Sequence, residues 1–133
     1  MNSLLGNIIN ITTDSSLSLV QLKVQNIVLT TIVIDTPETS NYLKVGNCVK
    51  VLFKETEVIL AKNISGIISL QNKIDCVVRS FEKGKLLCKI VLHFGDSKIT
   101  SVITRNAFDQ LEIQENDIIT VLIKTNEISL AHD

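Results

Sequence analysis

Hydrophobic and polar residues alternate along most of this chain, and that two-residue period is typical of half-buried β-strands. In the segment 17–24, for example, valine and leucine at positions 20, 22 and 24 alternate with Gln21 and Lys23. The pattern therefore predicts an all-β protein. The expected strands are Leu4–Thr12, Leu17–Val24, Ile27–Ile34, Cys48–Phe53 and Glu57–Ala61, then Cys76–Phe81, Leu86–Phe94, Lys98–Ile103, Ile118–Ile123 and Ile128–Ala131.

The chain also contains an internal repeat. Val51–Ala61 returns as Val121–Ala131 at an offset of 70 residues, with six of eleven positions identical. The same offset aligns Thr30 with Thr100, so the duplication covers nearly the whole length. We expect two domains, residues 1–63 and 64–133. Because no Pro-rich or Gly-rich linker joins them, they should pack together.

Each repeat should contain one short helix. Residues Asp35–Tyr42 begin with a capping residue and with Pro37, which suits a first helical turn. Asn106–Leu111 takes the same place in the second repeat. Five strands with a helix between the third and the fourth is the plan of an OB-like barrel. The predicted fold is therefore two tandem OB-like five-stranded barrels, each with one short helix.

Charge and composition argue against several classes of partner and site. The chain has 133 residues, 13 basic and 14 acidic, so its net charge of −1 disfavours nucleic acid as a partner. It shows no basic signal region and no apolar run long enough to span a membrane, which predicts a cytoplasmic protein without a membrane partner. Cys48, Cys76 and Cys88 lack paired spacing, so we expect three buried or partly buried thiols and no metal site.

The sequence shows no catalytic constellation. His93 and His132 are the only imidazoles, and neither has a nucleophilic partner in a recognisable motif. The five aromatic residues are spread thinly in apolar runs, unlike the stacking platforms of OB folds that bind single strands. We therefore predict that the protein is not an enzyme.

Several short motifs resemble the Mop or TOBE domain. That family follows the order Ser-Ala-Arg-Asn, Ile-Thr-Ala-Val-Ile-Thr, Lys-Glu-Gly-Asp and Val-Ile-Lys-Ala-Ser. The second repeat has Ser69–Asn72, Ile99–Thr104, Gln114–Asp117, Val121–Lys124 and Ile128–Ala131 in the same order. The first repeat resembles it through Asn2–Ile9 and Lys44–Ala61. The tandem pair is similar to the two-domain molbindins and to the C-terminal portion of the molybdate-responsive transcription regulator.

The resemblance implies a site for molybdate or tungstate. Both are tetrahedral dianions whose oxygens only accept hydrogen bonds, so a site needs ammonium, hydroxyl, amide or guanidinium donors. In the family the contributing turns meet between neighbouring domains or subunits. The implied oxyanion-binding residues are Ser69, Gln71, Asn72, Thr104, Arg105, Lys124 and Thr125.

Each of these residues also has a structural interpretation. Thr104 could cap the helix at Asn106, Lys124 could be solvated, and Ser69 and Asn72 could be turn residues. The sequence departs from the family at Gln71, where an arginine is common, and at Ala107, where a serine is common. Both departures remove a donor.

The resulting interpretation is a protein that binds molybdate or tungstate for intracellular storage or homeostasis. One alternative is an oxyanion-sensing regulatory module that acts through a partner protein, and another is a structural oligomerisation domain. We expect a homo-oligomer, with a trimer favoured over a dimer or hexamer, since two small barrels leave apolar surface uncovered. We also expect unequal repeats, because Lys54 is followed by Glu55 whereas Lys124 is followed by Thr125.

Overall fold

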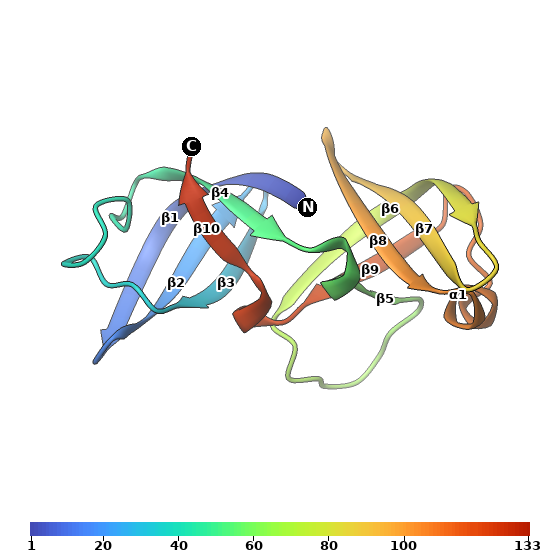
Figure 1. The fold of residues 1–133 in the computed structure, drawn as a ribbon, viewed down its shortest axis with the longest axis horizontal. Coiled ribbons are helices and arrows are strands. Elements are labelled where there is room, and N and C mark those ends of the chain that lie inside the picture. The colour runs from blue at the N-terminus through green and yellow to red at the C-terminus, as the bar shows by residue number, and fades with distance from the viewer.

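The computed structural model describes residues 1–133 as ten strands, one α-helix and two 3₁₀ turns. The strands form two five-stranded sheets that lie side by side along the long axis of the molecule (Figure 1). The first half contains β1 (Asn2–Asp14), β2 (Leu17–Val24), β3 (Ile27–Val33), β4 (Cys48–Phe53), η1 (Glu55–Glu57) and β5 (Ile59–Ala61). The second contains β6 (Asn72–Lys83), β7 (Leu87–Phe94), β8 (Ser97–Thr104), α1 (Arg105–Leu111), β9 (Ile118–Ile123), η2 (Thr125–Glu127) and β10 (Ser129–His132).

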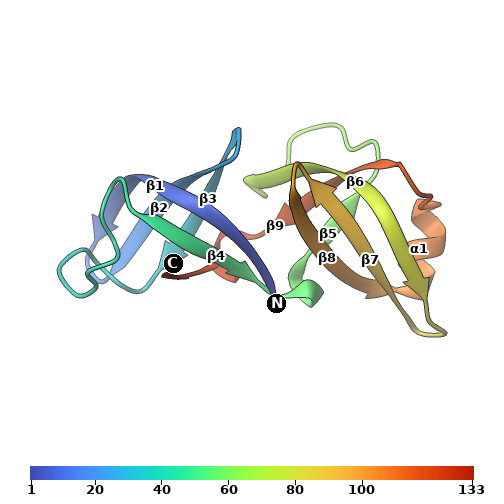
Figure 2. The ribbon, with the colours of Figure 1, turned by 90° about the horizontal axis from the view of Figure 1, so that it is seen from above.

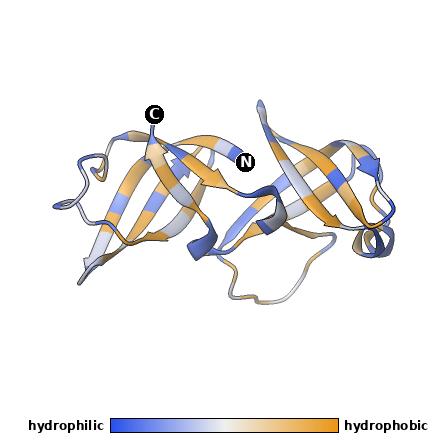
Figure 3. Ribbon diagram, viewed as in Figure 1, coloured by the Kyte–Doolittle hydropathy of each residue, from blue (hydrophilic) through white to orange (hydrophobic).

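Burial follows the alternation of the sequence. The first eight residues of β1 alternate between buried and exposed, and β6 repeats that pattern. The alternating orange and blue bands of Figure 3 show the same period on neighbouring strands. The inward-facing side chains join into one hydrophobic cluster of 26 buried residues, to which both halves contribute. This periodicity confirms the predicted all-β class.

The two sheets exchange their last short strands. The first sheet has the order β10-β4-β1-β2-β3, and the second has the order β5-β9-β6-β7-β8. The chain leaves the first sheet after β4 and contributes β5 to the second, then returns after β9 to contribute β10 to the first (Figure 2). Contacts between β3 and β10, and between β8 and β5, bring the two edges of each sheet together into a barrel.

The strand exchange does not follow the predicted domain boundary between residues 63 and 64. Strand β5 precedes that boundary but pairs with β9, whereas β10 follows it and pairs with β4. The boundary therefore divides the sequence repeat and not the folded sheets. The first barrel comprises residues 2–53 with 129–132, and the second comprises 59–61 with 72–123.

The offset of 70 residues persists in three dimensions. Adding 70 to the first and last residue numbers of β2 gives the bounds of β7, and the same holds for β4 and β9. The two 3₁₀ turns are related in the same way. Each barrel therefore repeats the other, and the short turns η1 and η2 are the two crossings between them.

Two expectations are wrong in detail. The first repeat has no α-helix: Asp35–Tyr42 forms turns, in which Thr36 and Thr39 bond each other through backbone and hydroxyl groups. Threonine, serine and asparagine favour such local bonds over helical ones. In addition, Cys48 is exposed, while Cys76 and Cys88 are buried as expected. A helix is present only in the second repeat, at Arg105–Leu111.

Candidate functional site

Two buried asparagines join the barrels. The Asn72 amide donates to the Thr30 carbonyl at 2.8 Å, and its oxygen accepts from the Thr30 N–H at 2.7 Å. Asn2 makes the same pair of bonds to Thr100, both at 2.8 Å. Because β3 and β8 are edge strands, each amide satisfies backbone groups that would otherwise lack partners. Asn72 is therefore a structural residue, and its buried amide is unavailable to a ligand.

Two hydroxyls complete this junction. The Thr31 hydroxyl donates to the carbonyls of Ile128 at 2.8 Å and Thr125 at 3.1 Å. Ser101 takes its place in the other barrel and donates to the Val58 carbonyl at 3.0 Å. These bonds fix the crossing turns η1 and η2 against the opposite barrel. The position of Thr125 is thus set by Thr31, a residue 94 positions away along the chain.

Five of the seven implied site residues belong to the segments that meet at the second crossing. Asn72 pairs with Ile123 across β6 and β9, so Gln71 and Lys124 follow at the same end of these two strands. Ser69 and Gln71 are exposed, as is Lys124. The Lys124 ammonium forms no ion pair, and Thr125 is half-buried in η2. This end of the barrel therefore presents the unpaired Lys124 ammonium beside hydroxyl and amide donors.

Thr104 and Arg105 lie at the other end of the second barrel. Thr104 pairs with Leu87 at the end of β8, and its hydroxyl accepts from the Ala107 N–H at 3.1 Å, which caps α1. The Arg105 guanidinium contacts Asp109 at 3.2 Å and donates to the Gly84 carbonyl at 3.3 Å. The capping interpretation of Thr104 is therefore correct.

The implied residues thus form two groups within one chain. Lys83, at the far end of β6, pairs with Cys88 near the Thr104 group, whereas Asn72 begins that strand near the Lys124 group. A strand of 12 residues spans up to about 40 Å. One molecule therefore does not bring Lys124 and Thr104 together, and Figure 1 shows α1 at the end of the second barrel that faces away from the first.

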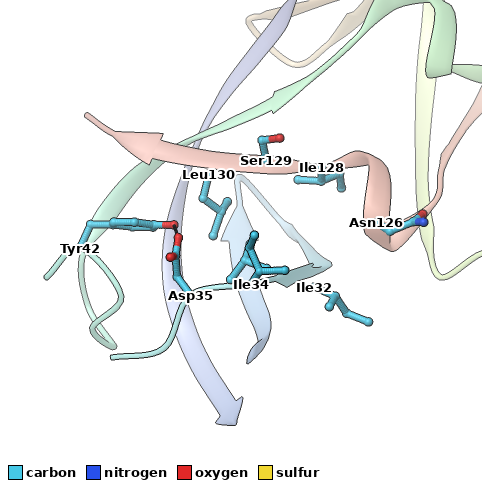
Figure 4. A pocket seen from close by; sticks show the side chains of 9 residues that line it. Ile32, Ile34, Asp35, Tyr42, Asn126, Ile128, Ser129 and Leu130 are labelled. Carbon is cyan, nitrogen blue, oxygen red and sulfur yellow. Dashed lines mark hydrogen bonds between the residues drawn. The ribbon is translucent and has the colours of Figure 1, made fainter. Parts of the chain in front are cut away.

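The equivalent positions of the first repeat have different chemistry. Lys54 precedes Glu55, whose carboxylate is 3.6 Å from the Met1 ammonium. Ile34 and Asp35 occupy the positions of Thr104 and Arg105. They line a groove of about 260 Å³ between the end of β3 and β10 (Figure 4).

A tyrosine on the rim of this groove holds the carboxylate of Asp35. The Tyr42 hydroxyl donates to Asp35 at 3.2 Å. Burial raises the pKa of Tyr42, and the Asp35 charge raises it further. The groove therefore presents a carboxylate and apolar side chains, and it offers an anion little attraction.

A few charged and titratable side chains elsewhere have structural partners or shifted pKa values. The Lys62 ammonium is 3.1 Å from Asp117 and donates to the Glu112 carbonyl at 2.8 Å. The Gln114 N–H and the Lys62 ammonium lower the pKa of Asp117. Burial, with a smaller effect of the Asp75 charge, raises the pKa of the Cys76 thiol to about 12. No group of three or more His, Cys, Asp or Glu side chains could hold a metal ion.

Sequence reasoning missed the residues that hold the site together. Asn2, Thr30, Thr31 and Ser101 were not recognised as bridges between the barrels. A signal for the first two was present, because Asn2 and Thr30 have identical counterparts at the offset of 70. A polar residue that stays identical in both repeats within apolar strands indicates a shared contact. The hydroxyls of Thr31 and Ser101 carry a weaker form of the same signal.

Comparisons with known proteins agree with this architecture. Residues 68–130 match the TOBE domain family. The chain is similar to the structure of the cytoplasmic molybdate-binding protein ModG with molybdate bound, which covers 99% of this chain and 96% of that chain at 22% identity and a TM-score of 0.90. This likeness shows the tandem OB-like fold.

A second solved structure, a molybdate-binding protein from Sporomusa ovata, covers 50% of this chain and 98% of that chain at 27% identity and a TM-score of 0.49. No curated protein matches the sequence. The one α-helix has seven residues, and no helix is long and apolar enough to cross a membrane.

Proposed function

We propose that this protein binds molybdate or tungstate for storage or homeostasis in the cytoplasm, without chemical turnover; the match of residues 68–130 to the TOBE domain family supports the proposal. The observation that carries the proposal is the unpaired ammonium of Lys124 beside Thr125, at the end of the barrel where Ser69 and Gln71 also lie. The likeness of the whole chain to a molybdate-binding protein supports the choice of ligand.

The donors suit a fully deprotonated tetrahedral dianion. Lys124 supplies charge, Thr125 and Ser69 supply hydroxyls, and Gln71 supplies an amide N–H. A carboxylate oxygen would repel such an ion, and none of these four side chains carries one. Phosphate near neutral pH brings a proton that needs an acceptor, so this donor set favours molybdate and tungstate over phosphate.

A second copy of the chain would complete the site. Thr104 and Arg105 are too far from Lys124 within one molecule, so we place them in the site from a neighbouring copy of a homo-oligomer, preferably a trimer. In a closed ring, each copy offers its Lys124 end to one neighbour and its Thr104 end to the other. Exposed apolar side chains of the first repeat, such as Leu5, Val28 and Ile34, support association.

Titration calorimetry tests the binding proposal. Molybdate and tungstate should bind with measurable heat, and sulfate and phosphate should bind at least about tenfold more weakly. Equal affinities for sulfate and molybdate would contradict the proposal, since they would indicate an unselective anion surface. Light scattering at the same protein concentration should give a multiple of the 14.7 kDa chain mass.

Mixed oligomers test the shared site. Chains with Lys124→Ala and chains with Thr104→Val should each bind molybdate weakly on their own. After unfolding and refolding together, one interface type retains both Lys124 and Thr104, and binding should partly return. The matched control is the double variant Lys124→Ala, Thr104→Val mixed with the single Lys124→Ala variant, which should stay inactive. Binding that does not return in the first mixture, at unchanged oligomeric mass, would contradict a site shared between copies.

A further inference from the structure

We infer that the second repeat alone builds the oxyanion site, and that the corresponding surface of the first repeat holds no anion. The inference rests on the proposed function. It follows from comparing the two repeats position by position at the offset of 70 residues, which the strands preserve. Each end of the site differs between the repeats in the same direction.

The end of the site that carries Thr104 and Arg105 has the opposite chemistry in the first repeat. In the second repeat, Thr104 and Arg105 offer a hydroxyl and a cation at the end of β8. At the end of β3, Ile34 is 81% exposed and offers no donor. Asp35 follows it with a carboxylate that already accepts from Tyr42. An anion placed against the first repeat would therefore meet a negative charge where the second repeat has a positive one.

The lysine end differs as well. Both repeats have a lysine at the end of the fourth strand, and both have an acidic residue, Glu57 or Glu127, within the following 3₁₀ turn. The repeats differ in the residue directly after the lysine. It is Glu55 in the first repeat and Thr125 in the second. The Glu55 carboxylate, which lies 3.6 Å from the Met1 ammonium, adds a negative charge after Lys54, whereas the Thr125 hydroxyl adds a donor after Lys124.

The two ends together decide the comparison. Beyond the shared acid, the second repeat presents the cations Lys124 and Arg105 with one carboxylate, Asp109, beside Arg105. The first presents Lys54 and the Met1 ammonium with two carboxylates, Glu55 and Asp35. A dianion is attracted by cations and repelled by carboxylates, so it prefers the second arrangement.

The surroundings of Ile34 differ from those of Thr104 in the same sense. Leu19 pairs with Ile32 across β2 and β3, and both lie on the outer face. The equivalent pair in the second repeat is Lys89 and Val102. The outer face beside Thr104 therefore carries a further cation, where the first repeat has only apolar side chains.

Stoichiometry tests the inference. We would measure bound molybdenum by equilibrium dialysis and mass spectrometry on the intact oligomer. A closed ring has one Lys124 site for each chain, so the wild-type protein should bind about one molybdate per chain. The triple variant Glu55→Thr, Ile34→Thr, Asp35→Arg should raise this to about two, since it gives the first repeat the counterparts of Thr125, Thr104 and Arg105 in addition to Lys54. The matched control, Lys124→Ala, should bind close to none.

Two results would overturn the inference. One is about two molybdates per wild-type chain, and the other is an assembled triple variant that still binds about one. Should the triple variant not assemble, Lys54→Ala in the wild-type background decides: unchanged stoichiometry supports the inference, and a loss of half the bound molybdate contradicts it. A wild-type protein that binds no molybdate at all would instead contradict the proposed function.

Discussion

The two repeats share their interior and differ on their surface. Asn2 and Asn72 make the same buried bridges with nearly equal bond lengths, and the strands around them follow one offset. On the outer strands, however, Leu19 and Val28 of the first repeat correspond to Lys89 and Lys98 of the second. The comparison teaches that buried polar contacts constrain a duplicated chain more tightly than its surface does.

The loop between the third and fourth strands gives the second contrast. In the second repeat, Ala107 and Leu111 favour a helix, which Thr104 caps. In the first repeat, Thr36 and Thr39 bond each other and hold the segment in turns. The capped helix fixes the direction of Thr104 and Arg105, so a difference in helix propensity becomes a difference in site geometry.

The largest expected effect tests the shared interior. Asn72→Ala leaves the N–H and carbonyl of Thr30 without partners on an edge strand that the other barrel covers, and should cost about 2–4 kcal/mol of unfolding free energy. Asn2→Ala should cost a similar amount through Thr100. Urea unfolding at fixed protein concentration measures both. A loss below about 0.5 kcal/mol in either variant would break the equivalence of the two bridges.

Lys124→Ala and Lys54→Ala form the next pair. Removing Lys124 should weaken molybdate binding by about 2 kcal/mol, or about 30-fold, because a charge-assisted contact is lost. Lys54→Ala should change the affinity less than about threefold. Calorimetry on both variants measures the difference. Equal losses would mean that the two repeats share one site or build two similar ones.

A smaller effect is expected for association. Leu19→Glu places a charge in the apolar surface of the first repeat and should raise the dissociation constant of the oligomer about tenfold, which corresponds to about 1.4 kcal/mol. The matched control is Lys89→Glu, which changes a charged side chain at the equivalent position and should have less effect. Analytical ultracentrifugation over a dilution series measures both. If Lys89→Glu raised the dissociation constant more than Leu19→Glu, the apolar surface of the first repeat would have no role in association.

The smallest expected effect concerns acid stability. The folded state lowers the pKa of Asp117 through the Gln114 N–H and the Lys62 ammonium, so this carboxylate stabilises the fold above its unfolded pKa of about 3.9. The contribution is lost as pH falls through the lower, folded value. Asp117→Asn should therefore reduce the loss of stability on acidification below about pH 4.

The first repeat already has Asn47 at the position of Asp117, which makes Asn47→Asp the matched control. Thermal unfolding between about pH 2 and 6 measures both variants. An unchanged acid profile in Asp117→Asn would show that the carboxylate has no such role.

Much of the fold was predictable because alternation marks strands directly. The bounds of β2, β4 and β9 agree with the sequence-based prediction at every terminal residue. The strand exchange was not predictable from alternation. Ile59-Leu60-Ala61 and Ser129-Leu130-Ala131 are nearly the same sequence, so the pattern says that both are strands but not which barrel each one joins. The short turns η1 and η2 decide this in three dimensions.

The candidate site was predictable only in part. The family resemblance grouped Lys124 with the segment before β6, and the pairing of Asn72 with Ile123 brings Gln71 and Lys124 to the same end of the second barrel. The commitment of the Asn72 amide to Thr30 could not be predicted, because their contact joins residues 42 positions apart in different barrels. The separation of Thr104 from Lys124 likewise depends on the length of β6 and on the order of the sheet.

A crystal grown with tungstate tests the central claim most directly, because tungsten scatters anomalously and its position needs no prior assumption about the site. The account predicts an anomalous peak within bonding distance of Lys124 and Thr125 of one copy and beside Thr104 of a neighbouring copy. No peak of comparable height should occur beside Lys54. A dominant peak at Lys54, or none at Lys124 in a crystal saturated with tungstate, would contradict it.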